Sequence, residues 1–301
     1  MATDQTSDRA EPGSAPSSRA LKSQRIVYSP GYRSKAGPFA ALRAYAGEIR
    51  RDRWQIWMNF LRKFKSSYNT TFFGMFWAFA LPLVPIGAYT LLATMRVVTV
   101  TDQMPYLVYI ALGVTLYAYV TAPIEQTMAA LKGEMALLSK THIGVFSVIL
   151  GRFGTVVFET LIRLAYIVIL MAIYGGYPTH WTSLLFIPLL FGVFLSSLGV
   201  GLLLSIFNAV AADVEKVVSV ILRFGVFFSG VFFPMPTTGK SGMFAPFNPI
   251  LTFVDGLRSQ LVKGHVTDWH VLASTLGAGL FVFLIAVVMF YRAEPHLRSA
   301  G

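Results

Sequence analysis

Long uncharged stretches, separated by short polar segments, dominate the pattern of this 301-residue chain. The stretch from Phe72 to Met95 contains no charged residue. Because a helix rises ~1.5 Å per residue, this stretch is long enough to cross the ~30 Å hydrocarbon core of a bilayer. The same pattern predicts six spans, at residues 72–95, 104–124, 154–174, 183–207, 217–233 and 271–291. The chain is therefore predicted to be an all-α integral membrane protein with six transmembrane helices.

Two segments precede the first span. Residues 1–37 are rich in Ser, Ala, Pro, Gly and Arg, which predicts a disordered cytoplasmic tail. Residues 38–65 predict an amphipathic interface helix on the inner membrane face. Its apolar stripe consists of Phe39, Leu42, Ala46, Ile49, Ile56 and Phe60. Its charged residues lie mostly away from that stripe, and they are Arg43, Glu48, Arg50, Arg51 and Asp52. A membrane anchor and a docking surface for a cytoplasmic partner both fit this helix.

The segment before the last span, residues 235–270, is too apolar for a simple loop and too interrupted for a span. Pro246 and Pro249 break it, and residues 250–262 predict a short amphipathic helix. Irregular backbone is tolerated at membrane depth only where protein or a water-filled cavity covers it. We therefore expect an external re-entrant hairpin in a transmembrane domain of residues 66–292, followed by a cytoplasmic tail at residues 293–301.

The charge distribution predicts the orientation. Only 13% of the residues are charged and 55% are hydrophobic, whereas soluble domains carry about a quarter charged residues. Of the 25 Lys and Arg residues, 13 precede Thr71. The predicted inner segments hold 19 of them and the outer segments four. Because Lys and Arg near a span favour the cytoplasmic side, both termini are predicted to be cytoplasmic. This bias also explains the net charge of +11, so no nucleic-acid partner is expected.

Catalytic signatures are missing from the sequence. It has no Cys, no P-loop, no GxSxG and no HExxH, and its five His residues are scattered over loops and tails. Glu159 and Arg163 lie four residues apart in the third span, and we predict that they form a structural ion pair. No catalytic or metal site is therefore expected, and a partner must supply the energy for any uphill transport.

Aromatic residues are frequent in the predicted spans. Most of them are expected to face lipid or the interfaces, but some could line a channel. Sugar rings present apolar C–H faces that stack on aromatics, so such a lining would suit a sliding glycan. The candidate channel-lining residues are Phe73, Trp77, Tyr117, Phe227, Phe228 and Phe232.

The order of these parts carries a resemblance to a known family. A basic amphipathic helix leads into LRKFKSSYNTTFFGMFWAFALPL, and a helical inner loop separates the second and third spans. Next come ADVEKVVSVILRFGVFFSGVFFP and FNPILTFVDGLRSQLVKG. Over residues 40–292 the chain resembles the membrane subunit of type-2 ABC exporters of polysaccharides, the O-antigen and capsular polysaccharide permeases. The matching positions are Arg62, Lys63, Lys65, Gly74, Trp77, Pro82, Asn248, Pro249 and Arg258.

This resemblance implies a homodimeric channel in a bacterial inner membrane that exports a lipid-linked polysaccharide. Each copy would dock on an ABC ATPase subunit, which binds ATP and Mg, so this chain would bind no cofactor itself. Docking would use residues 38–61 and the inner loop 126–147, with a coupling surface of Arg50, Arg51, Lys132, Glu134 and Lys140. An external gate would include Asn248, Pro249 and Arg258. A periplasmic or outer-membrane export partner would continue the path in some systems.

Two alternatives stay open at this point. One is a type-2 permease for another substrate, such as a teichoic-acid-like polymer, a lipid or a drug. The other is a membrane-embedded scaffold that transports nothing.

Overall fold

The computed structural model describes residues 37–68, scattered residues between 74 and 91, and residues 104–138, 144–175, 180–211, 213–234 and 248–299. In these ranges the elements are helices, without strands, which confirms the all-α prediction for this part of the chain. The α-helices are α1 (Pro38–Tyr68), α3 (Tyr106–Leu138), α4 (Val145–Tyr174), α5 (Phe186–Val210), α6 (Asp213–Gly225), α8 (Pro249–Lys263) and α9 (Trp269–Ser299). Two 3₁₀ turns are η1 (Trp181–Leu185) and η2 (Val226–Phe228).

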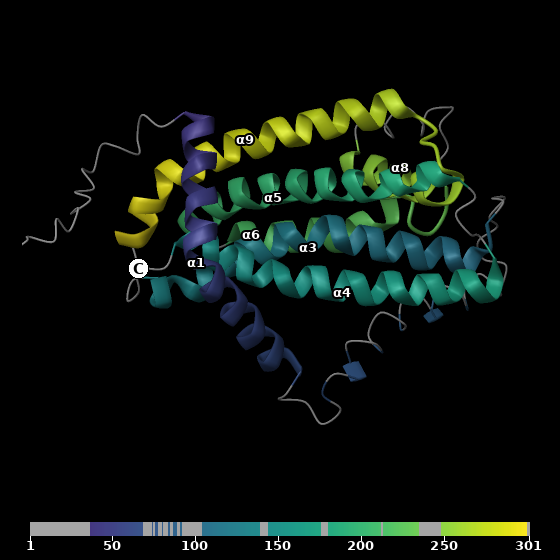
Figure 1. Cartoon of the computed structure of the whole chain (residues 1–301), viewed down its shortest axis with the longest axis horizontal. Coiled ribbons are helices and arrows are strands. Elements are labelled where there is room, and N and C mark those ends of the chain that lie inside the picture. Colours follow the sequence, from purple (N-terminus) through teal and green to yellow (C-terminus); the bar gives the residue numbers. More distant parts are fainter. Residues whose placement is uncertain are drawn as a thin grey trace, which may run out of the picture.

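Four long helices lie side by side in the order α9, α5, α3 and α4 (Figure 1). The short helix α6 contacts α3 and α5. Helix α1 crosses one end of the row and contacts α4 and α9, whereas α8 lies toward the other end against α3, α5 and α9 (Figure 1). The C-terminal end of α9 also lies at the α1 end.

Four segments are long and apolar enough to cross a membrane: Tyr106–Ala130, Phe146–Tyr174, Trp181–Val210 and Trp269–Glu294. They correspond to the predicted second, third, fourth and sixth spans. The predicted first span, 72–95, falls largely outside the described residues. The number of six spans therefore stays a prediction.

The predicted fifth span, 217–233, is not a continuous helix. Helix α6 has 13 residues, so it rises roughly 20 Å, which is short of a ~30 Å hydrocarbon core. Beyond Gly225 the chain forms η2 and then a turn in which Gly230 has a φ of +66°. Val231 and Phe232 are buried after this turn. The uncharged run resembles a span in composition, but its glycines allow the backbone to turn inside it.

Small residues bring α5 close to its neighbours. A Cβ atom on Gly199 would lie 2.5 Å from the Cα of Phe283 in α9. A Cβ atom on Gly201 would lie 3.0 Å from the Cα of Ile124 in α3. Glycine at both positions therefore permits close approach of the helix backbones.

Local sequence signals account for two further features. The predicted pair of Glu159 and Arg163 is present in α4, with Oε2 and a guanidinium nitrogen 3.5 Å apart. Helix α8 occupies the predicted short amphipathic stretch. The side chain of Asn248 caps its start, and Gly264, with a φ of +71°, follows its end. The rest of the predicted hairpin, before Asn248, lies outside the described residues, and the re-entrant path is untested.

Helix α1 occupies the stretch predicted as an interface helix, but its packed face differs from the predicted stripe. Ala41 and Tyr45 are buried, whereas Phe39 is 86% exposed. Asp52 is only 6% exposed, and Glu48 is partly buried beside it. The prediction that these two acidic residues lie away from the packed face is wrong, because this face meets the polar start of α4.

Candidate functional site

Two carboxylates of α1 accept hydrogen bonds from the start of α4 and so fix α1 to the bundle. Glu48 and Asp52 are four residues apart, so they lie on one face of α1. The Ser147 N–H donates to Glu48 Oε1 (3.2 Å), and the Gly144 N–H donates to Asp52 Oδ2 (3.4 Å). The Ser147 hydroxyl lies 3.1 Å from Glu48 Oε1 and 3.2 Å from Asp52 Oδ2. We call these four residues the α1–α4 junction. Its two carboxylates accept hydrogen bonds from N–H groups that lack partners within α4.

The α1–α4 junction depends on a glycine. Gly144 is the N-cap of α4 and has no side chain, and the Glu48 carboxylate occupies the space that a Cβ atom on Gly144 would need. Beside the carboxylates, the rings of Tyr45 and Phe146 stack at a centroid distance of 4.4 Å. The Tyr45 ring also meets the edge of Tyr291 from α9 at 5.5 Å. Polar and aromatic contacts together fix α1 to α4 and α9.

The two carboxyl groups of the junction have opposite pKa changes. Burial raises the pKa of Glu48 above its ordinary value, and the charge of Glu294 adds to this, although hydrogen bonds from Ser147 oppose it. Burial would also raise the pKa of Asp52, but hydrogen bonds from Arg51 and the Gly144 N–H, with the Arg51 charge, lower it overall. Asp52 is therefore held as an anion, and Glu48 is the group that is more easily protonated.

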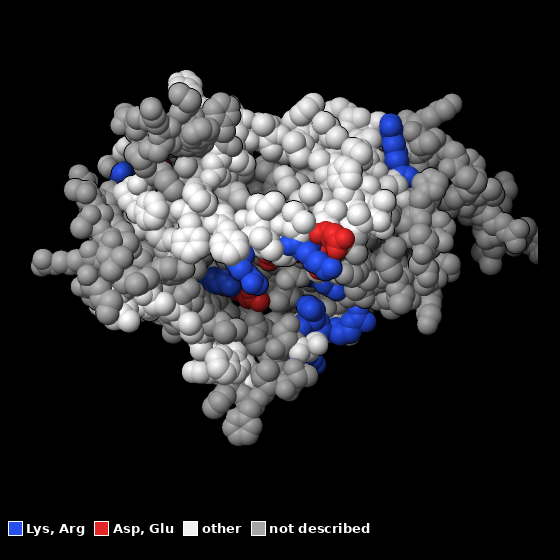
Figure 2. All heavy atoms as spheres, turned by 180° about the vertical axis from the view of Figure 1, so that it is seen from behind, with Lys and Arg blue, Asp and Glu red and all other residues white. Residues whose placement is uncertain are grey.

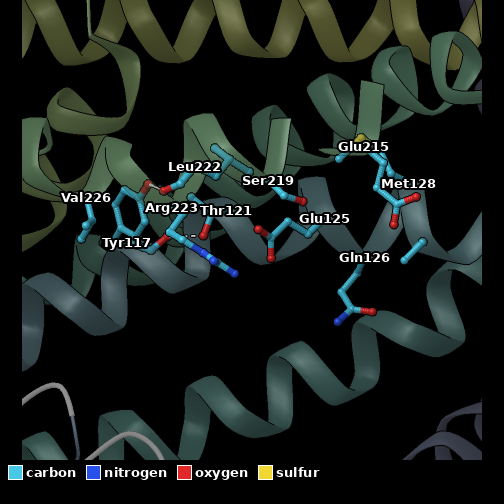
Figure 3. A pocket seen from close by; sticks show the side chains of 11 residues that line it. Tyr117, Thr121, Glu125, Gln126, Met128, Glu215, Ser219, Leu222, Arg223 and Val226 are labelled. Atoms are coloured by element: carbon cyan, nitrogen blue, oxygen red, sulfur yellow. Dashed lines mark hydrogen bonds between the residues drawn. The ribbon is translucent and has the colours of Figure 1, made fainter. Parts of the chain in front are cut away.

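A second polar feature is a cavity of about 630 Å³ between α3 and α6, the α3–α6 cavity (Figure 3). Ile250 of α8 packs against Met128 and Leu222, which both line it. Its lining residues are Tyr117, Thr121, Glu125, Gln126, Met128, Ala129, Glu215, Ser219, Leu222, Arg223 and Val226. Acidic and basic side chains gather near the middle of the face shown in Figure 2, among residues that are mostly uncharged.

Tyr117 connects the two walls of the α3–α6 cavity. Its hydroxyl donates to the main-chain carbonyl of Leu222 in α6. A Cβ atom on Gly225 would lie 3.1 Å from this hydroxyl, so the glycine leaves room for the tyrosine. The Tyr117 side chain, predicted to line a channel, thus lines the cavity while its hydroxyl holds α6 against α3.

The other predicted channel-lining aromatics are not gathered in one place. Phe227 and Phe228 are exposed, by 44% and 67%, in η2 directly after α6. Phe232 is buried in the core with its ring 5.6 Å from that of Phe227. Trp77 is 38% exposed, and Phe73 lies outside the described residues. A common channel wall for this set stays a prediction.

The predicted coupling surface is described only in part. Arg50 and Arg51 are exposed on α1, and Arg51 Nε lies 2.8 Å from Asp52 Oδ1. Lys132 and Glu134 belong to the last turns of α3, where the structure describes the helix but not their side chains. Lys140 lies outside the described residues.

The predicted gate residues tie α8 to the turn after α6. Asn248, next to Pro249 at the start of α8, donates from its amide to the Phe228 carbonyl at 2.8 Å. The buried Arg258 donates to the Gly230 carbonyl at 3.0 Å, and its guanidinium lies 3.8 Å from the centre of the Tyr109 ring. The Tyr109 hydroxyl donates to the same carbonyl at 3.0 Å. These contacts hold α3, α8 and the turn together, and a gating role is untested.

Comparison with known proteins identifies the family. Residues 54–262, more than half of the chain, match the ABC-2 type transporter family. A search of curated proteins gives no match. ABC-2 permeases are membrane components that work with a separate ABC ATPase subunit. Among the residues that the structure describes, no cluster of three or more His, Cys, Asp and Glu could hold a metal ion. The chain therefore belongs to the ABC-2 type transporter family, as a multi-pass permease component of an ABC transporter.

Proposed function

We propose that the chain is the permease subunit of an ATP-driven exporter that moves a lipid-linked polysaccharide, such as capsule or O-antigen, across a bacterial inner membrane. Two copies form the channel, and each docks on one ATPase subunit that binds ATP and Mg. Both termini face the cytoplasm, so α1 lies on the side where ATP is hydrolysed. The permease provides the path, and the ATPase provides the energy.

The observation that carries the proposal is the α1–α4 junction. One face of α1 is fixed to α4 by hydrogen bonds from Ser147 and Gly144 to its two carboxylates. On other faces, α1 exposes the cations Arg43, Arg50 and Arg53. A partner that binds this exposed surface would move α4 together with α1. This arrangement supports a role of α1 in coupling ATP hydrolysis to the membrane helices.

The α3–α6 cavity supports a glycan as the substrate. Sites for drug-sized ligands are lined mainly by apolar side chains, with a few polar groups. This cavity instead has charged and hydroxyl side chains on both walls, with the amide of Gln126 on the α3 wall beside the aromatic ring of Tyr117. A lipid tail or an apolar drug would leave most of these polar groups without partners.

Co-expression with candidate ATPase subunits tests the proposal. We expect a stoichiometric ATPase to co-purify in mild detergent, and to be lost when residues 38–61 are deleted. Cells that lack the permease should lose surface polysaccharide, and the wild-type gene should restore it. If an ATPase co-purifies but another substrate is exported, the polysaccharide assignment is wrong. If no ATPase binds, a non-transporting scaffold replaces the whole proposal.

A further inference from the structure

We propose that the face of α1 turned away from the bundle binds the headgroups of anionic phospholipids. This face, the lipid face of α1, consists of Arg50, Arg53, Trp54, Trp57 and Met58, which are all exposed. The inference goes beyond the proposed function, because it concerns neither the transported substrate nor the ATPase. It also says more than that α1 is a membrane anchor, because it assigns a charge class to the lipid and names the side chains that distinguish it.

Helix α1 lies at the level where candidate spans begin and end. It crosses the row of long helices at one end (Figure 1). It contacts α4 at Gly144 and Ser147, where the candidate span Phe146–Tyr174 begins. It contacts α9 at Tyr291, close to the end of the candidate span Trp269–Glu294. Because both contacts are at span ends, α1 lies beside the headgroup region rather than the middle of the hydrocarbon core.

The two tryptophans of the lipid face lie close to this boundary. A Cβ atom on Gly154 would lie 2.6 Å from the Phe60 ring, and Gly154 is where the sequence predicts the third span to begin. The Trp57 ring lies 5.3 Å from the Phe60 ring, and Trp54 is three residues earlier. Tryptophan is enriched at this depth, because its ring is apolar and its N–H reaches polar headgroup atoms. Trp54 and Trp57 are 69% and 52% exposed, so both rings are accessible to lipid.

Each tryptophan has an arginine one turn before it. Arg50 and Trp54 are four residues apart, as are Arg53 and Trp57, so each pair shares a stretch of the helix surface. Met58 follows Trp54 by four residues and extends the apolar part of this surface.

The two arginines lie on the polar side of the tryptophans. Asp52 lies against Gly144, whereas Phe60 lies against Gly154, farther along α4. Toward its N-terminus α1 therefore leaves the span. This order places the guanidinium groups nearer to the phosphates and the indole rings nearer to the acyl chains.

The exposed charge of α1 has one sign. The helix contains seven Lys and Arg residues and two acidic residues, Glu48 and Asp52. Both carboxylates belong to the α1–α4 junction, where Ser147 and the Gly144 N–H donate to them. Asp52 also pairs with Arg51. The exposed charged residues of α1 are therefore cations, and a negatively charged surface is complementary to them.

An anionic phospholipid matches both parts of the lipid face. Its phosphate accepts charge-assisted hydrogen bonds from Arg50 and Arg53. Its glycerol and acyl chains cover the apolar surface of Trp54, Trp57 and Met58. A soluble anion would leave this apolar surface uncovered, and a zwitterionic headgroup would bring a second cation beside the arginines. A lipid with a net negative headgroup is therefore the ligand class that fits.

Tryptophan fluorescence provides a direct test, because bromine atoms on lipid chains quench indole on contact. The chain has five Trp residues, and Trp77→Phe, Trp181→Phe and Trp269→Phe together leave Trp54 and Trp57 as reporters. The full-length permease is placed in phosphatidylcholine nanodiscs that contain a small fraction of brominated phosphatidylglycerol or of brominated phosphatidylcholine. The control protein keeps Trp181 alone, which is 83% exposed and has no Lys or Arg within four positions.

We expect brominated phosphatidylglycerol to quench Trp54 and Trp57 far more than brominated phosphatidylcholine at the same mole fraction. Each cation near an anionic membrane surface favours binding by about fivefold, so two arginines give a preference of roughly 25-fold. Trp181 should be quenched equally by both lipids. High salt should reduce the preference at α1, because it screens the charges.

Charge removal shows whether the named arginines cause the preference. Arg50→Gln combined with Arg53→Gln should remove most of it and leave quenching by brominated phosphatidylcholine unchanged. Lys216→Gln is the matched control, because it removes an exposed cation from α6, and it should leave the preference intact.

Three results would overturn the inference. They are equal quenching of Trp54 and Trp57 by the two brominated lipids, a preference that survives removal of both arginines, and loss of the quenching when the ATPase subunit is added. The last result would show that the ATPase, not lipid, covers this face in the assembled transporter. The quenching by lipid needs neither substrate nor ATP, so a positive result stands even if the proposed function is wrong.

Discussion

The α1–α4 junction and the α3–α6 cavity use the same kinds of side chains in opposite ways. At the junction, the carboxylates of Glu48 and Asp52 are occupied by N–H and hydroxyl donors of α4. In the cavity, Glu125 and Arg223 face open space without hydrogen bonds to other described residues. Satisfied buried polar groups fix a structure, whereas polar groups that line a cavity are available to a ligand. The difference supports the roles proposed for the two regions, coupling at the junction and substrate contact in the cavity.

The largest expected effect comes from filling the space at Gly144. Gly144→Ala places a methyl group where the Glu48 carboxylate lies, and overpacking of this kind costs about 1–3 kcal/mol. We expect a lower melting temperature and weaker stimulation of ATP hydrolysis by substrate. Gly47→Ala is the control, since no atom lies within 4 Å of its added Cβ, and it should stabilise α1 by roughly 0.5–1 kcal/mol. Equal stability of the two variants would contradict the tight junction.

The next effect is on binding and comes from the cavity. Glu125→Gln removes a charged acceptor, and hydrogen bonds to charged groups contribute about 1.5–3 kcal/mol, so affinity for a neutral sugar should fall by tenfold or more. Because this side chain is exposed to the cavity, stability should change by less than about 0.5 kcal/mol. Sugar titration and thermal melting of the same preparation measure both quantities. A large drop in melting temperature would show that Glu125 contributes to folding rather than to sugar binding alone.

A smaller effect is expected from the pH dependence of the junction. The raised pKa of Glu48 means that its protonated form favours the folded junction, so this contribution is lost as pH rises through its folded pKa. The lowered pKa of Asp52 means the reverse, with stability present above its unfolded pKa and lost on acidification. The melting temperature of Glu48→Gln should therefore fall less than that of the wild type as the pH is raised from the acidic range. If the melting temperature of the variant depends on pH as that of the wild type does, ionisation of Glu48 does not destabilise the junction.

The smallest effect is expected on the exposed side of α1. Arg50→Glu should weaken binding of the ATPase subunit only a few-fold, because exposed ion pairs contribute about 0.2–1 kcal/mol each. Quantitative co-purification at increasing salt checks this, since screening should reduce the difference. Lys263→Glu, at the end of α8 on the other side of the row, should have no effect. A loss of binding in both variants would argue against α1 as the docking surface.

Local patterns in the sequence predict much of this fold. Spans of uncharged residues, the Glu159–Arg163 pair and the short helix after Asn248 depend on neighbours a few positions apart, so periodicity and spacing are sufficient. The turn within the predicted fifth span is different. Its residues are as apolar as a span, and only the Gly225 and Gly230 positions hint that the helix ends.

The polar sites could not be predicted, because their partners are distant in the chain. Ser147 is 99 residues from Glu48, and Leu222 is 105 residues from Tyr117. A pattern confined to α1 makes Glu48 and Asp52 resemble a solvated face, although their spacing of four residues does place them together. Likewise, Glu125 and Arg223 resemble ordinary charges near membrane ends until α3 and α6 are packed. Tertiary structure decides which charges become structural and which remain available.

One paired measurement tests this central claim most directly. Asp52→Asn and Glu125→Gln make the same chemical change, in the junction and in the cavity, and both would be introduced into the transporter. The melting temperature and the affinity for a neutral hexasaccharide are then measured on each. We predict that Asp52→Asn lowers the melting temperature and keeps sugar binding, whereas Glu125→Gln keeps the melting temperature and loses sugar binding. If both variants lose the same property, or the two results are exchanged, the division between a structural junction and a substrate cavity is wrong.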